Sequence, residues 1–370
     1  MKLTIERSAL LKSLAHIQSV VERRNTIPIL SNVLLRAEND KLFLTATDMD
    51  LTVIESTGAT VSQNGSTTAP AHTLYEIIRK LSDGAPVELT LKDAQLTIRS
   101  GRSRFSLGTL PVADFPAYDN KPLLHKFMLP ASELRSLIDR TRFAVSQEET
   151  RYYLNGIYIH ATQSNDVPVL RAVATDGHRL ARIEMPLPEG AAKIPGVIVP
   201  RKTIAEIRKL VDENNNNIEI SLSETQIRFS MDGIVLSSKL IDGTFPDYER
   251  VIPQDNNKIL EVDRRVFADA VDRVATINSE KSRAIKLSLQ PGTLTLTAQS
   301  AESGQAHEEI EVSYNSDPIE IGFNSRYLLD ITQQIESEGT RFRLSDGASP
   351  TIIQDPSDAS SVYVLMPMRV

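Results

Sequence analysis

The sequence predicts an α+β fold of three similar domains, each with two helices packed on antiparallel sheets. A short alternating run that leads into a helix-like stretch occurs three times, beginning at Lys2, Lys126 and Ile259. A second helix-like stretch follows in each copy, and the first two copies close on a Phe-Pro-x-Tyr segment. Because this period is too long for a solenoid, each copy is expected to have its own core. The domains are expected at 1–120, 126–252 and 258–370.

The first helix of each copy is predicted from residues at i, i+4 and i+7, which share one face of a helix. We expect these helices at 8–21, 132–145 and 263–275. Their buried stripes are Leu10, Leu14 and Ile17, then Leu134, Ile138 and Thr141, then Phe267, Val271 and Val274.

The second helix of each copy shows a similar spacing and is expected at 73–82, 201–211 and 324–336. The corresponding stripes are Leu74, Ile77 and Leu81, then Ile204, Ile207 and Val211, then Leu328, Ile331 and Ile335.

Alternating strand runs fill the space between the helices, with hairpin turns expected at 92–94, 223–225 and 290–293. The predicted order in each copy is a strand, a helix and three strands, repeated once. Each copy therefore consists of two similar halves. Polar, proline-containing segments at 118–122 and 252–257 are the expected linkers.

The chain has 370 residues and no cysteine, which excludes disulfides, thiolate zinc sites and a cysteine nucleophile. No apolar run reaches membrane-spanning length, and the N-terminus does not have the pattern of a signal peptide. We therefore expect a cytoplasmic protein without a membrane partner.

The net charge of −7 argues at first against a nucleic-acid partner, because phosphate contacts need Lys and Arg. The total hides a local difference, however. The predicted helices of the first two copies are net positive, most strongly at 201–211, whereas those of the third copy are neutral or acidic. A basic helical surface is one explanation, and the good helix propensity of Lys and Arg is the other.

The segment 175–180 contains Asp176 and His178, which could in principle form an acid–base pair. The matching place in the first copy, 47–51, carries different side chains, which favours a structural turn. The sequence contains no Gly-x-Ser-x-Gly motif, no histidine pair with metal-ligand spacing and no glycine-rich phosphate loop. We therefore predict no catalytic residue, no metal site and no cofactor.

Two segments favour contacts with other chains. Alternation places Arg102 and Arg104 on one face of a strand and Phe105 and Leu107 on the other, as in an edge strand that pairs with another subunit. The C-terminal segment 366–368 contains a proline between two methionines. Proline cannot continue a ladder easily and methionine adapts to varied partners, so we interpret this segment as one wall of a surface pocket.

Four motifs together resemble the bacterial sliding-clamp family, the beta subunits of DNA polymerase III. The resemblance covers the whole chain, and it implies a DNA sliding clamp without enzymatic activity. Such a clamp encircles duplex DNA and tethers the replicative polymerase, which makes DNA replication processive. The motifs are Arg151-Tyr152-Tyr153-Leu154-Asn155-Gly156, Ala174-Thr175-Asp176-Gly177-His178-Arg179-Leu180, Asp242-Gly243-x-Phe245-Pro246-Asp247-Tyr248 and Met366-Pro367-Met368-Arg369.

The resemblance further implies a head-to-tail homodimeric ring of similar domains, with sheets outside and helices around double-stranded DNA. Contacts to the DNA backbone would be independent of sequence. The family's acidic cluster opposite the basic interface strand is reduced here, so we expect a weaker attraction across the interface. The implied DNA-binding residues are Arg24, Tyr152, Tyr153, Arg201 and Lys202, and the implied dimer interface comprises Arg102, Arg104, Phe105, Leu107, Ile277 and Glu302.

The resemblance also implies a pocket between the second and third copies for a short motif with a Gln and two apolar anchors. The DNA polymerase III alpha subunit, the clamp loader, other polymerases and repair proteins would bind there. Ala348 and Pro350 stand on an expected rim strand where the family suggests Val and Ser. The implied pocket residues are Leu154, Thr175, Gly177, His178, Arg179, Leu180, Pro246, Val251, Val364, Met366, Pro367 and Met368.

From the sequence alone, two other classes of function stay open. One is a hydrolase or lyase that uses Asp176 and His178. The other is a repeat-built scaffold that binds proteins but not DNA.

Overall fold

The computed structural model describes residues 1–23, 26–119, 121–213, 216–278, 283–301 and 303–369. Within these residues six α-helices form, two in each repeated part of the sequence, as predicted. They are α1 (Arg7–Gln18), α2 (Ala71–Lys80), α3 (Ala131–Asp139), α4 (Arg201–Asp212), α5 (Arg264–Ala275) and α6 (Ser325–Thr332).

The strands follow the predicted order, with β5 and β22 as short additions. The first part contains β1 (Lys2–Glu6), β2 (Asn32–Glu38), β3 (Lys41–Thr47), β4 (Leu51–Gly58), β5 (Thr60–Gln63), β6 (Gly65–Pro70), β7 (Pro86–Lys92), β8 (Gln95–Ser100) and β9 (Ser103–Gly108). The second contains β10 (His125–Pro130), β11 (Gly156–Ser164), β12 (Val167–Thr175), β13 (Arg179–Pro186), β14 (Val197–Pro200), β15 (Asn217–Leu222), β16 (Gln226–Met231) and β17 (Ile234–Lys239). The third contains β18 (Lys258–Asp263), β19 (Ala284–Gln290), β20 (Thr293–Ser300), β21 (Gly304–Glu311), β22 (Ser313–Tyr314), β23 (Ile319–Asn324), β24 (Gly339–Leu344), β25 (Thr351–Asp355) and β26 (Asp358–Leu365).

The strands of the second part complete two different sheets. Its strands β10 and β15–β17 join β2–β4 and β6 in an eight-stranded sheet through the antiparallel pair β17–β4. Its strands β11–β14 join β18, β22 and β24–β26 in a nine-stranded sheet through the pair β13–β26. The same kind of strand pairing therefore occurs at both junctions between repeats.

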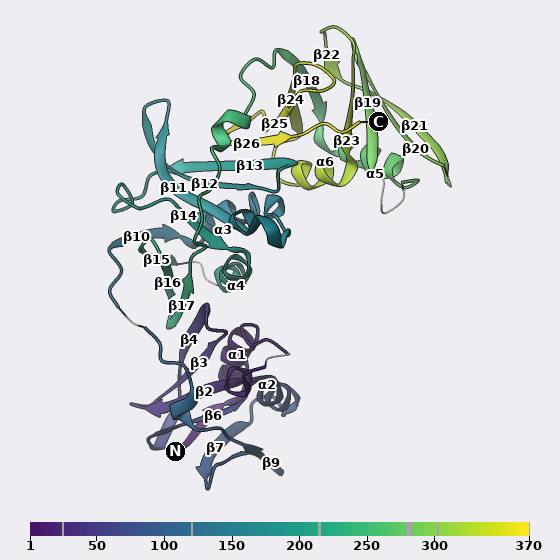
Figure 1. The fold of residues 1–370 in the computed structure, drawn as a ribbon. Helices are drawn as coiled ribbons and strands as arrows, with labels where there is room; N and C mark the ends of the chain where they lie inside the picture. Colours follow the sequence, from purple (N-terminus) through teal and green to yellow (C-terminus); the bar gives the residue numbers. More distant parts are fainter. Residues whose placement is uncertain (24–25, 120, 214–215, 279–282, 302, 370) are drawn as a thin grey trace. The chain divides into compact units, whose positions relative to one another are not determined.

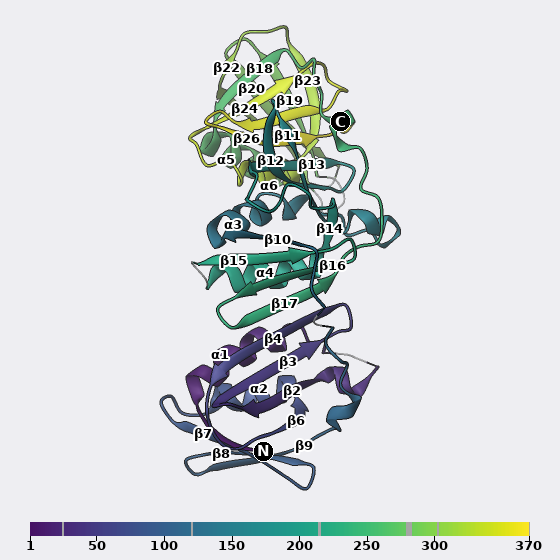
Figure 2. The same ribbon diagram turned by 90° about the vertical axis from the view of Figure 1, so that its left-hand side faces the viewer.

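Each of these sheets belongs to a different compact unit. The first unit comprises Met1–Arg135, Pro188–Ile194 and Lys202–Leu240, and the second comprises Ser136–Leu187, Pro195–Arg201 and Ile241–Val370. In the first unit α1 packs against α2 and against β3 and β4 (Figure 1). Figure 2 shows the same sheet from its strand side, with α1, α2 and α4 behind the strands.

Two smaller sheets end on exposed strands. The five-stranded sheet has the order β5-β1-β7-β8-β9, and the four-stranded sheet has the order β21-β20-β19-β23. Strands β9 and β21 are thus edge strands, and most of their residues are exposed.

The helices bury the predicted stripes. Leu10, Leu14 and Ile17 of α1 are completely buried, and so is Thr141 beyond the end of α3. One detail differs in α2, which buries Ile78 fully and Ile77 partly, because positions i+3 and i+4 lie on the same helix face.

The helix α3 ends at Asp139, well before the expected residue 145. The buried Thr141 hydroxyl donates to the Leu137 carbonyl at 2.5 Å, which satisfies an acceptor at the end of the helix. Arg140 and Arg142 therefore lie outside the helix, so their charges do not belong to the helical surface that the sequence predicted.

Several of the remaining helix cations have acidic partners. Lys12 lies 3.2 Å from Glu213, and Arg79 lies 2.8 Å from Glu76. The helical surface is consequently less basic than a count of Lys and Arg indicates. No helix of the described residues is long and apolar enough to cross a membrane.

Candidate functional site

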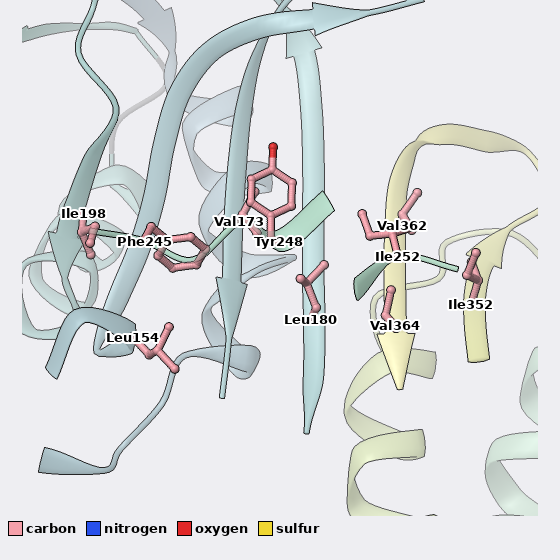
Figure 3. Close-up of a cluster of buried hydrophobic side chains, with 10 residues drawn as sticks. All are labelled: Leu154, Val173, Leu180, Ile198, Phe245, Tyr248, Ile252, Ile352, Val362 and Val364. Atoms are coloured by element: carbon pink, nitrogen blue, oxygen red, sulfur yellow. The ribbon is translucent and has the colours of Figure 1, made fainter. Parts of the chain in front are cut away.

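The second unit contains a surface cavity of about 200 Å³. Its floor belongs to a buried apolar cluster in which Leu154, Leu180, Val364 and Tyr248 come from different elements of the chain (Figure 3). The residues that line the cavity are Leu154, Thr175, Gly177, Arg179, Leu180, Pro246, Asp247, Tyr248, Val251, Val364 and Met366.

A tight turn between β12 and β13 forms one wall. The Thr175 hydroxyl donates to the Arg179 carbonyl at 2.7 Å and accepts from the Gly177 amide at 3.1 Å. The Asp176 carboxylate accepts from the amides of His178 and Arg179 at 3.0 and 3.1 Å. Gly177 has a φ of 87°, a value that favours glycine. These short polar side chains therefore fix the turn through its own backbone.

The side chain of Arg179 lies beneath this turn and is nearly buried. Its guanidinium donates to Asp176, to Asp330 of α6 at 2.5 Å and to the Phe143 carbonyl at 2.6 Å. It also stacks over the Tyr327 ring, 4.2 Å from the centroid. Charge-assisted contacts of this kind are strong, and removing one partner of a buried pair costs about 3–5 kcal/mol. Arg179 thus holds this wall against α6.

The opposite wall depends on Tyr248, which follows the Phe-Pro-Asp segment. Its hydroxyl accepts from Arg171 at 2.8 Å and lies 2.9 Å from the His160 Nε2 atom. Arg171 is buried and also donates to Glu184 at 2.9 Å and to Glu249 at 2.6 Å. Burial raises the pKa of Tyr248 and, together with the Arg171 charge, lowers that of His160. The tyrosine therefore stays neutral and fixed.

The C-terminal segment passes beside the turn. The Met366 amide donates to the His178 carbonyl at 2.9 Å, and the Met368 amide donates to the Gly322 carbonyl at 2.9 Å. Met366 lines the cavity, whereas Pro367, Met368 and His178 do not. Two lining residues, Asp247 and Tyr248, were absent from the sequence prediction, although the Phe-Pro-x-Tyr repeat was a signal for them.

The structure gives Asp176 and His178 no catalytic arrangement. The Asp176 carboxylate contacts the backbone of His178, whereas the His178 ring stacks near Tyr327 at 6.4 Å between centroids. Among the described residues no group of His, Asp and Glu side chains is arranged to hold a metal ion.

Tyr152 and Tyr153 lie in the short helix Glu149–Leu154, outside the cavity. Their rings pack edge to face at 5.8 Å, and Tyr152 is 54% exposed. Gly243 approaches this pair closely, since a Cβ atom there would lie 3.0 Å from the Tyr153 Cβ. The pair is therefore an exposed aromatic feature with limited freedom to move.

Arg201 and Lys202 open α4, although cations are normally unfavourable at a helix N-terminus. Arg201 is exposed, and its amide donates to the Asn155 carbonyl at 2.9 Å. Lys202 is half-buried and binds Asp48 and, at 3.1 Å, Glu22. Burial opposes its charge, but these carboxylates outweigh that effect and raise the pKa of Lys202. Arg201 is thus more available for an external anion than Lys202. Arg24 lies outside the described residues.

The predicted interface residues lie on and beside the edge strand β9. Arg102 is in the turn before β9, Arg104 and Phe105 are exposed on it, and Leu107 is half-buried. Most residues of β9 are exposed and the strand lies at the edge of its sheet, as the sequence predicted for an edge strand. Ile277 is half-buried after α5, and Glu302 lies outside the described residues.

The expected rim strand at Ala348 and Pro350 is also wrong. Both residues lie in the loop between β24 and β25. The Asp346 carboxylate accepts from the Ala348 amide at 2.8 Å, and the Pro350 carbonyl accepts from Asn256 at 2.9 Å. These bonds favour a turn over a strand, and neither residue lines the cavity.

Three family models cover nearly the whole chain. The N-terminal domain of the DNA polymerase III beta subunit matches residues 1–119, the central domain matches 128–247, and the C-terminal domain matches 249–369. The chain belongs to the DNA polymerase III beta-subunit family. It therefore contains three beta-clamp domains. Proteins of this family are known to form ring-shaped dimers.

Sliding clamps from several bacteria are similar over their full length. The beta sliding clamp of Caulobacter vibrioides strain NA1000 / CB15N is 57% identical over 372 residues, and that of Escherichia coli strain K12 is 38% identical over 371 residues, with 100% of both chains covered in each case.

Solved sliding-clamp structures have the same fold. A C. crescentus beta sliding clamp, with PEG bound to a proposed beta-motif tethering region, has a TM-score of 0.98 and 57% identity, covering 100% of this chain and 99% of that one. A Bartonella birtlesii sliding clamp bound to griselimycin has a TM-score of 0.98 and 50% identity, with 100% of both chains covered. The chain is a DNA sliding clamp of replication, a processivity factor rather than an enzyme, with DNA and polymerase as its partners.

Proposed function

We propose that the clamp ring closes through the edge strands β9 and β21 of two subunits, with the helices of its domains around duplex DNA. The observation that carries this proposal is the repeated strand pairing. At the first junction β4 pairs with β17, and at the second β13 pairs with β26. In the repeat, β21 corresponds to β4 and β13, and β9 corresponds to β17 and β26. The same rule applied once more pairs β21 with β9 of another subunit, which is a head-to-tail contact.

Three repeats of each subunit would then form one continuous series around the ring, with domains proposed at 1–120, 126–252 and 258–370. Apolar contact at this interface comes from Phe105, Leu107 and Ile277, and charged contact from Arg102 and Arg104 toward Glu302. A closed ring retains DNA by topology, so weak contacts to the backbone suffice.

The proposed DNA contacts are Arg24, Tyr152, Tyr153, Arg201 and Lys202. Arg201 supports this role best, because its side chain is exposed at the start of α4 and its charge favours a phosphate. Lys202 would have to leave or share its carboxylate partners to contact DNA.

The proposed peptide site is the cavity between Tyr248, the 175–179 turn and Met366. Its apolar floor suits two hydrophobic anchors, and its polar rim suits a Gln side chain. The partners would be the DNA polymerase III alpha subunit, the clamp loader, other polymerases and repair proteins, in the cytoplasm. The relatives with PEG at a tethering region and with griselimycin bound support the presence of a ligand site in these clamps.

A topological experiment tests the ring. The clamp is placed on nicked circular DNA by a clamp loader, separated from free protein, and the circle is then cut at one site. We expect the clamp to stay on the intact circle and to leave within minutes of cutting, because a linear duplex has ends. A circle cut but blocked at both ends by bound protein is the control, and it should retain the clamp. Retention on open linear DNA would contradict the proposal.

A further inference from the structure

The first unit contains a second cleft at the place equivalent to the peptide cavity. It has a volume of about 250 Å³, close to the 200 Å³ of the peptide cavity. Thr47, Met49, Thr52, Tyr118, Ser237 and Lys239 are among the residues that line it.

The turns beside the two clefts have the same backbone. The Thr47 hydroxyl donates to the Leu51 carbonyl at 3.0 Å, as Thr175 does to Arg179, and the Asp48 carboxylate accepts the amides of residues 50 and 51. Met49 even adopts a φ of 82°, close to the 87° of Gly177. The scaffold of the cleft is therefore repeated, including its unusual backbone angle.

The strand registers match as well. Thr52 pairs with Ser237 between β4 and β17, as Leu180 pairs with Val364 between β13 and β26. The Lys239 amide donates to the Asp50 carbonyl at 2.8 Å, which corresponds to the bond from Met366 to His178 at 2.9 Å. Three positions thus correspond residue by residue, and in each the apolar side chain of the peptide cavity is replaced by a polar one.

The polar groups of the second cleft already have partners. The Thr52 hydroxyl donates to Thr47 at 2.9 Å, the Ser237 hydroxyl lies 2.9 Å from that of Tyr118, and the Lys239 ammonium contacts Asp50 at 3.0 Å. These groups are therefore already hydrogen-bonded or ion-paired within the protein. An apolar anchor that entered the cleft would have to bury these polar groups. Losing the burial of one large apolar side chain reduces affinity by about 10–100-fold.

We propose that Thr52, Ser237 and Lys239 are specificity-determining residues that restrict the partner peptide to one of the two equivalent junctions within a chain. This inference rests on the proposed peptide site. The backbone at the first junction has the same conformation as at the peptide cavity. The polar side chains of the first junction prevent the peptide from binding there.

The test converts the second cleft. The full-length clamp carrying Thr52→Leu, Ser237→Val and Lys239→Met is titrated with a short synthetic peptide that has one Gln and two Leu anchors. Isothermal titration calorimetry gives the number of sites. We expect one peptide per chain for the unaltered protein and two for the triple variant.

A second set of variants separates the possible outcomes. Adding Leu180→Thr and Val364→Ser to the triple variant should remove the original site and leave one peptide per chain, in the new cleft. A triple variant that keeps the unaltered melting temperature and dimer mass but binds a single peptide would overturn the inference. If the triple variant does not fold, Thr52→Leu with Lys239→Met is judged by the same criterion. An unaltered protein that binds no peptide would instead refute the proposed peptide site.

Discussion

Gly177 and Met49 stand at equivalent positions of two turns, yet one is a glycine and the other is not. Outside glycine, a left-handed backbone costs about 1–2 kcal/mol, which the first turn accepts at Met49. The difference lies in the neighbours, because a Cβ atom at Gly177 would lie 2.5 Å from the Arg151 Nη1 atom. Arg151 is itself held by Glu148 at 2.8 Å. Glycine at 177 thus avoids both the cost of the backbone angle and a displacement of the flexible end of the Arg151 side chain.

We therefore expect Gly177→Ala to lower the affinity for motif peptides by about 10-fold, because the added Cβ atom strains the backbone of the turn that lines the cavity by about 1–2 kcal/mol and displaces the Arg151 guanidinium. Fluorescence anisotropy with a labelled peptide measures the change. Gly292→Ala is the matched control, since Gly292 has a φ of 79° but a Cβ atom added there would have no neighbouring atom within 4 Å. Equal affinities for the two variants would show that the close approach does not matter.

Helix α1 is attached to strand β4 by a buried polar contact. Glu55 is almost buried on β4 and accepts from Ser13 at 2.7 Å, and it lies 2.8 Å from the His16 Nδ1 atom. Glu213 lies 3.3 Å from the other ring nitrogen. Burial opposes protonation of His16, but the two carboxylates outweigh it and raise its pKa above the ordinary value of 6.5.

The raised pKa gives the contact a definite pH dependence. The folded state favours protonated His16, so this contribution is complete below the unfolded pKa and is lost as the pH rises through the folded one. We expect the stability advantage of the unaltered clamp over His16→Gln to shrink as the pH rises above about 6.5, as measured by urea unfolding. His72→Gln is a control, because His72 contacts Gln18 and a carbonyl rather than a carboxylate. A difference for His16→Gln that does not change with pH would contradict this account.

At the scale of elements, the sequence predicts a helix or strand correctly where a single local pattern determines it. Apolar stripes predicted the six helices, at i, i+4 and i+7 in the first helix of each copy and at i, i+3 and i+7 in the second, because burial of one helix face depends on spacing alone. The end of α3 was missed because Thr141 is buried beyond the helix end, so the buried stripe continues past the last helical residue. The loop at 346–350 was expected as a strand. The Asp346 carboxylate accepts hydrogen bonds from the amides of Ala348 and Ser349, and such bonds cannot be read from a hydrophobic pattern.

The candidate cavity was predictable to a similar extent. Motif resemblance named nine of its eleven lining residues, but it could not show that His178, Pro367 and Met368 lie beside the cavity rather than in it. Their side-chain directions depend on the backbone bonds of Met366 and Met368. The ion pairs of Lys202 were likewise hidden, because Glu22 and Asp48 are distant in sequence.

At the scale of the whole molecule, the interface proposal depends on a few exposed side chains. Phe105 is 38% exposed on the edge strand β9, although aromatic rings are usually buried. Truncating a central aromatic residue of an interface costs about 2–4 kcal/mol, which corresponds to about 30–1,000-fold in the dissociation constant.

Phe105→Ser should therefore shift the clamp from dimer toward monomer by about that factor, as measured by sedimentation equilibrium. The matched control is Leu124→Ser, since Leu124 is 88% exposed in the segment before β10. The control should leave the dimer unchanged. A Phe105→Ser variant that dimerises like the unaltered clamp would remove β9 from the proposed interface.

Because neighbouring repeats share sheets, the boundaries of the repeats are poor places to cut the chain into separately produced fragments. The sequence repeats three times, but the second repeat contributes strands to two sheets that belong to different compact units. A single repeat produced alone would expose the bare edge of β4, β13, β17 or β26, and unpaired edges of this kind promote aggregation. The repeated segment of the sequence is therefore shorter than a fragment in which every strand keeps its sheet partners.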